Sequence, residues 1–70
     1  MDRETVERNF TYRRWTEDEI KKFRPLREFA KEYALKIQEL VPECPEKEHA
    51  FTHLEETIYF INAGISRYGG

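Results

Sequence analysis

Aromatic and basic side chains alternate in residues 9–15, which read N-F-T-Y-R-R-W. Aromatic rings stack on nucleobases, and guanidinium groups contact phosphates with two hydrogen bonds at once. Tyr12, Arg13, Arg14 and Trp15 therefore have the chemistry of a nucleotide-binding segment. An alternative interpretation is that the rings of Phe10, Tyr12 and Trp15 pin this segment onto the rest of the chain or onto a neighbouring subunit.

Two other polar residues stand beside apolar positions. Arg27 lies between Phe23 and Ala30 in the sequence, where its head would either extend into water or meet an anion. Asn62 follows Ile61 and is either a polar contact that fixes the register of paired helices or a ligand contact.

A metal site has weaker support. His49, His53 and Glu56 share one helical face at spacings of four and three, but they lack the H-E-x-x-H arrangement, and an exposed polar stripe is the simpler interpretation. Cys44 has no base near it in the sequence, and there is no glycine-rich phosphate loop or paired-carboxylate pattern. We predict a protein that is not an enzyme and has no metal site and no cofactor.

Two amphipathic helices would position these residues. Apolar side chains recur at spacings of three and four along two stretches, which is the pattern of helices that pair. They are Phe23, Leu26, Ala30, Tyr33, Ile37 and Leu40, and then Phe51, Leu54, Ile58, Ile61, Ile65 and Tyr68. Each row is about 26 Å long at the rise of an α-helix. Because the joining segment is short and contains two prolines, the sequence predicts an antiparallel helical hairpin.

The boundaries follow from local signals. Thr16 and Glu19 form a capping box, so a helix should begin there. Pro25 should break or kink this helix, whereas Pro45 suits the first turn of the next. Residues 1–9 would tolerate a helical turn, and the stretch from Asn9 to Trp15 should be extended. The predicted fold is all-α, a single helical domain at 1–70 with an arm at 1–15, a helical segment at 16–41 and a second long helix at 45–68.

The totals favour an oligomer. Seventy residues with a single cysteine cannot form an internal disulfide, and domains this small usually need a disulfide, a metal or association. Ala50, Thr57 and Gly64 recur every seven residues and would let another backbone approach closely. A lone thiol suits a reducing cytoplasm, and no membrane span or signal-peptide core is predicted. The net charge of −2 disfavours a coat of polymeric nucleic acid but allows a small anionic ligand.

The spacing of several motifs resembles a known family. The chain reads N-F-T-Y, then L-R-E-x-A-K-E-x-A, a proline-containing turn, and A-x-T-x-L-E-E-x-x-x-x-x-N-A-x-I-x-R. This pattern runs from Asn9 to Arg67 and resembles the bacteriophage anti-CBASS cyclic-oligonucleotide sponges. The most specific part is the spacing from the L-E-E at residues 54–56 to the N-A at residues 62–63.

The resemblance implies a small helical protein that assembles as a homohexamer in the cytoplasm of the infected bacterial host. It implies that cyclic dinucleotides, and in some members cyclic trinucleotides, are held between protomers and are not cleaved, so that CBASS anti-phage immunity is counteracted. It places the base-stacking tyrosine at Tyr12, the basic residue of the long helix at Arg27 and a terminal arginine at Arg67. Asn9 and Arg13 are further candidate ligand-binding residues.

The sequence departs from the family beside the expected pocket. The run Arg13-Arg14-Trp15 replaces one like His-Pro-Pro, Pro25 falls inside a helix, and Cys44 stands where serine is usual. Two alternatives to a sponge remain. One is a helical protein–protein interaction module without a nucleotide ligand, and the other, weaker one is a metal-assisted hydrolase built on the two histidines.

Overall fold

The computed structural model describes residues 1–12 and 14–69, and all of its regular structure is helical. The elements are α1 (Arg3–Phe10), α2 (Glu17–Leu40) and α3 (Pro45–Tyr68). No strand occurs within these described ranges, so the all-α prediction is confirmed. None of the helices in the same ranges is both long and apolar enough to cross a membrane.

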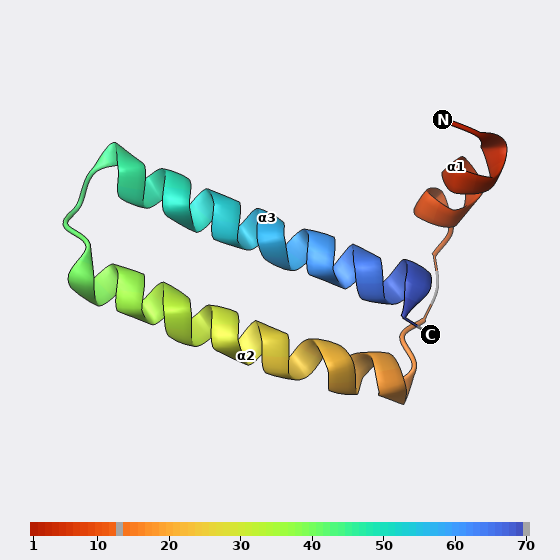
Figure 1. The fold of residues 1–70 in the computed structure, drawn as a ribbon, viewed down its shortest axis with the longest axis horizontal. Helices are drawn as coiled ribbons and strands as arrows, with labels where there is room; N and C mark the ends of the chain where they lie inside the picture. The colour runs from red at the N-terminus through yellow and green to blue at the C-terminus, as the bar shows by residue number, and fades with distance from the viewer. Residues whose placement is uncertain (13, 70) are drawn as a thin grey trace.

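The two long helices carry most of the structure. In Figure 1, α2 and α3 lie side by side and run in opposite directions, joined by residues 41–44. The short α1 lies beyond the far end of this pair, near the start of α2 and the end of α3. Arg8 of α1 donates a hydrogen bond to the hydroxyl of Tyr68, and its guanidinium carbon lies 4.8 Å from the centre of that ring.

The start of α2 has the capping box that the sequence predicts. The Thr16 hydroxyl accepts a hydrogen bond from the Glu19 amide at 3.2 Å, and the Glu19 carboxylate accepts one from the Thr16 amide at 2.8 Å. Of the break and the kink that the sequence allows at Pro25, the break does not occur, because α2 is one helix from Glu17 to Leu40. A proline removes one helical donor, and the capping box together with packing against α3 offsets that loss.

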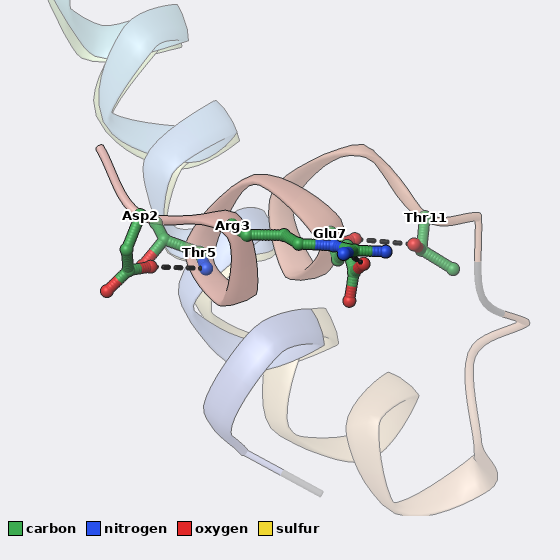
Figure 2. A network of polar contacts seen from close by, with 5 residues as sticks. All are labelled: Asp2, Arg3, Thr5, Glu7 and Thr11. Atoms are coloured by element: carbon green, nitrogen blue, oxygen red, sulfur yellow. Dashed lines mark hydrogen bonds and ion pairs between the residues drawn. The ribbon is translucent and has the colours of Figure 1, made fainter.

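Helix α1 extends further than expected. Asn9 and Phe10 were predicted to be extended, but they form the last turn of the helix. Figure 2 shows the polar contacts that favour helix in this segment: the Asp2 carboxylate accepts from the Thr5 amide at 2.8 Å, and Arg3 pairs with Glu7 at 2.9 Å. These are an N-cap and an i,i+4 ion pair, two local signals that outweigh the lack of an apolar period.

The cap at Asp2 should make α1 sensitive to acid. Hydrogen bonds from the Thr5 side chain and backbone hold the pKa of the Asp2 carboxyl below its ordinary value of 3.8, because they favour the charged form. A lowered pKa stabilises the fold above the ordinary value, and this stability is lost as the pH falls through the lowered value. We expect the helical Cα chemical shifts of α1 to diminish in that range. Asp2→Asn, which caps without charge, should remove this pH dependence.

The start of α3 depends on a buried lysine. Pro45 occupies the first turn, and Cys44 provides no side-chain cap. Lys47 is 3% exposed, and its ammonium group donates to the Gln38 carbonyl at 3.2 Å and to the Glu43 carboxylate at 2.6 Å. The Gln38 carbonyl belongs to the last turn of α2, where helical acceptors have no partner within the helix. Lys47 therefore fastens the start of α3 to the end of α2.

Replacing Lys47 by methionine should destabilise the protein by about 1–2 kcal/mol, because the side-chain stem is kept while two hydrogen bonds are lost. Urea unfolding at a fixed protein concentration, followed by circular dichroism, measures the change. Glu43→Gln is the matched control. Since the Glu43 side chain is 81% exposed, we expect the loss of its negative charge to change the free energy of unfolding by less than about 0.5 kcal/mol. Equal effects of the two substitutions would contradict this role for Lys47.

The molecule has no interior of its own. Its extents are 44 × 29 × 13 Å, and the smallest is close to the diameter of one helix with its side chains, about 10–12 Å. No hydrophobic side chain in residues 1–12 and 14–69 is fully buried. The accessible surface is 6063 Å², whereas a compact monomer of 8.5 kDa exposes about 4,700 Å². A stable domain normally has two packed layers, and this chain supplies one.

Candidate functional site

Two hollows meet at Arg27, between α2 and α3. The first, here called the aromatic hollow, has a volume of about 360 Å³ and is lined by Trp15, Ile20, Phe23, Arg24, Arg27 and Asn62. The second, the apolar hollow, has a volume of about 270 Å³ and is lined mainly by Ala30, Ala34, Phe51, Leu54 and Ile58, with Arg27 at the boundary that both share. Ligand pockets in proteins start at about 300 Å³, so of these two hollows the aromatic one falls in that range.

The aromatic hollow combines rings with a guanidinium group. The rings of Trp15 and Phe23 meet edge to face, with centroids 5.3 Å apart and planes at 69°. The guanidinium carbon of Arg27 lies 6.0 Å from the centre of the Phe23 ring. Phe23 thus orients the tryptophan on one side and the arginine on the other, since aromatic pairs and cations over ring faces both have preferred geometries. A flat aromatic ligand with a negative charge fits such a wall.

Three cations follow one another along the same side of α2. Arg24, Arg27 and Lys31 are spaced three and four apart and share a helical face, and we call them the cationic row. In the described part of the chain, no carboxylate lies within ion-pair distance of any of them. Like charges at this spacing destabilise a helix by a few tenths of a kcal/mol. A bound anion would relieve this repulsion.

The other predicted ligand residues lie elsewhere in the protomer. Tyr12 is 89% exposed in the segment between α1 and α2 and lines neither hollow. It is nevertheless close to the aromatic hollow along the chain, because three extended residues reach no further than about 11 Å. Asn9 is half-buried in the last turn of α1. Arg13 lies outside the described residues.

Arg67 belongs to a third hollow, between α1 and the last turn of α3. It lies in the last turn of α3 and lines a space of about 380 Å³ together with Glu4, Glu7, Arg8, Thr11 and Ser66. Two carboxylates share this space with the two arginines, so its charge is more balanced than that of the cationic row. Within one protomer, the structure therefore does not bring Arg67 and Arg27 into a common cavity.

Residues that sequence reasoning did not place at the site surround Arg27. Trp15 was weighed both as part of a nucleotide-binding segment and as a structural pin, Asn62 was left between two roles, and Arg24 was one of many basic residues. All three line the aromatic hollow. The spacing of Arg24 to Arg27 on one helical face could have indicated Arg24. The positions of Trp15 and Asn62 depend on how the segment before α2 and the middle of α3 approach α2, which no local pattern shows.

The histidines do not form a metal cluster with their neighbours. His53 contacts Glu56 through Nδ1 at 3.1 Å, and both side chains are largely exposed. Across residues 1–12 and 14–69, no three histidine, cysteine, aspartate or glutamate side chains come together in a way that could hold an ion.

Comparison with other proteins adds no relative. The chain matches no protein-family model, no curated protein and no solved structure.

Proposed function

We propose that this protein is a homo-oligomeric sponge for cyclic oligonucleotide messengers. It binds cyclic dinucleotides, and cyclic trinucleotides as a second class, without cleaving them, and so counteracts CBASS immunity in the cytoplasm of an infected bacterium. The observation that carries the proposal is the cationic row, which has no counter-ion among the described residues and borders the aromatic hollow. Phosphodiesters supply the missing negative charge, and nucleobases supply flat rings for the aromatic wall.

The motif resemblance supports the same ligand class. The resemblance points most directly to Tyr12 and Arg27 as ligand-binding residues. Arg27 lies where the two hollows meet. Tyr12, which is exposed and lies three residues before Trp15 in the sequence, is available to stack on a base held near Arg27. Asn9, Arg13 and Arg67 remain weaker candidate contacts of the sponge.

Association of copies is part of the proposal. The protomer exposes about 1,400 Å² more than a compact monomer of its mass, and one partner in a standard interface buries about 800 Å². The exposed side chains Leu26, Phe29 and Tyr33 lie on the side of α2 opposite to the cationic row, as the helical spacing requires. The two long helices would thus form an antiparallel hairpin that binds ligand on one face and other protomers on the other, in a homohexamer.

A ligand screen tests the proposal. The protein is heated with cyclic di-AMP, cyclic di-GMP, cyclic GMP-AMP and cyclic tri-AMP in turn, with linear dinucleotides as controls. A ligand at 100 times its Kd should add about 2.7 kcal/mol of stability and raise the melting temperature. The ligand recovered after denaturation should be intact by chromatography. No shift with any cyclic ligand would favour the interaction module, and recovery of a linear product would favour a hydrolase.

A further inference from the structure

Among the described residues, the side chain of Asn62 has no hydrogen-bond partner. It is half-buried in the middle of α3 and lines the aromatic hollow, yet in the described residues its amide makes no hydrogen bond. It is not sealed from solvent, since no buried side-chain polar atom in that part of the chain lacks a hydrogen bond. The amide is therefore open to solvent and available to a ligand that enters the hollow.

Trp15 and Arg24 belong to the same hollow as Asn62. Trp15 comes from the segment before α2, Arg24 from α2 and Asn62 from α3, so the three are brought together only by the fold. They supply an aromatic ring, a cation and an amide with one donor and one acceptor side. This combination can stack on a base, contact its phosphate and distinguish its edge.

We infer that Asn62 reads the edge of an adenine base that lies in the aromatic hollow beside Trp15, with Arg24 joining Arg27 at the adjoining phosphate. The inference rests on the proposed function and names the base that the sponge prefers. It makes Trp15, Arg24 and Asn62 ligand-contacting residues in addition to Tyr12 and Arg27.

The choice of adenine follows from hydrogen-bond complementarity. Adenine presents a donor at N6 beside an acceptor at N7, and the oxygen and NH₂ of an asparagine amide pair with both. Guanine presents two acceptors, O6 and N7, so the amide oxygen would face an acceptor of the same sign. A site that hydrogen-bonds the polar edge of one base strongly rejects a base with a different edge, because the hydrogen-bonding group of the protein is then left unpaired.

The base is assigned to the aromatic hollow because of the lining of the two spaces. The apolar hollow is formed almost entirely by carbon atoms, chiefly of Ala30, Ala34 and Phe51, and offers no side-chain amide to a base edge. The aromatic hollow offers a ring, two guanidinium groups and an amide in a larger volume. Arg27 lines both hollows, so the phosphate attached to the bound nucleoside would lie at the boundary between them.

Calorimetry with cyclic di-AMP and cyclic di-GMP tests the inference on the full chain. Asn62→Leu, which keeps the size of the side chain, should weaken cyclic di-AMP binding at least tenfold and cyclic di-GMP binding less than threefold. Asn62→Asp should also weaken cyclic di-AMP binding, because a carboxylate repels N7. Trp15→Ala should weaken both ligands, and Trp15→Phe should retain most of the affinity. Gln38→Leu removes an amide that lines neither hollow and should change nothing.

The outcomes separate the two proposals. If the unaltered protein binds neither ligand nor any other cyclic oligonucleotide, the proposed function itself fails. If it binds cyclic di-AMP but Asn62→Leu leaves that affinity unchanged, or lowers both affinities equally, the reading of adenine fails while the sponge stands. Light scattering on the same samples covers the remaining possibility. Dissociation of the oligomer by Asn62→Leu would show that this amide fixes helix pairing and would overturn the inference.

Discussion

Replacing Arg27 by alanine is expected to weaken the binding of a cyclic dinucleotide by roughly tenfold to a hundredfold, without changing the oligomeric state. A hydrogen bond between charged groups contributes about 1.5–3 kcal/mol, which corresponds to this range of affinity. Arg27 has no ion-pair partner among the described residues, so its removal leaves no carboxylate unpaired in the protein. Isothermal calorimetry gives the affinity, and size-exclusion chromatography on the same sample gives the assembly.

Two variants bracket this result. Arg27→Lys should recover only part of the loss, because an ammonium group cannot make the planar, two-pronged contact of a guanidinium. Lys36→Ala removes a cation from α2 that pairs with Glu39 at 3.6 Å and lines neither hollow at Arg27, and it should bind as the parent does. A loss of the same size in Lys36→Ala would mean that net charge, and not the position of Arg27, governs affinity.

Tyr12→Ala should have an effect comparable to Arg27→Ala, since stacking contributes about 1–3 kcal/mol per base. Tyr12→Phe should retain most of the binding because the ring is kept. The exposed position of Tyr12 makes it a sensitive test of the site. If Tyr12→Ala binds as tightly as the parent, or loses binding only because the oligomer dissociates, the segment before α2 is structural and the assignment of Tyr12 is wrong.

Gly64→Leu should split the assembly while leaving the protomer helical. A Cβ atom at residue 64 would meet no atom within 4 Å beyond the adjacent backbone of its own helix, and leucine favours helix over glycine by up to about 1 kcal/mol. Any loss of association must then come from a neighbouring chain that approaches this side of α3. Static light scattering measures the mass, and circular dichroism measures the helix content.

The control for this prediction is His49→Leu, which adds a leucine to an exposed position of α3 away from the row formed by Ala50, Thr57 and Gly64. It should assemble as the parent does. A well-folded monomer for the unaltered protein would contradict the whole oligomer proposal, and a Gly64→Leu variant of unchanged mass would show that α3 does not approach another backbone there.

The helical class could be predicted because its signals are local. The apolar spacing and the capping box at Thr16 act within one or two turns, and the structure has helices at both places. The extent of α1 and the continuity through Pro25 were harder to predict, since in each case a few polar contacts or the packing of a neighbouring helix outweighs the local preference. Propensity is regularly overridden in this way.

In the candidate site, too, only the residues marked by a local pattern could be predicted from the sequence. Arg27 could be found from the sequence, because a cation next to apolar helical positions is unusual. The approach of Trp15 to Phe23 and of Asn62 to Arg24 joins residues from three separate segments. Such contacts depend on the path of the chain between helices, and no spacing in a single helix encodes them.

The 13 Å thickness of the protomer has a consequence for its behaviour on dilution. A chain without an enclosed apolar interior can bury more apolar surface only against other molecules, so in the proposed oligomer folding and association would be one equilibrium. We expect the melting temperature to rise with protein concentration and a dilute sample to be cleaved readily by a nonspecific protease. In a cell, newly made chains would be short-lived until enough of them had accumulated to associate. The proposed sequestration of cyclic oligonucleotides would then increase steeply with expression level.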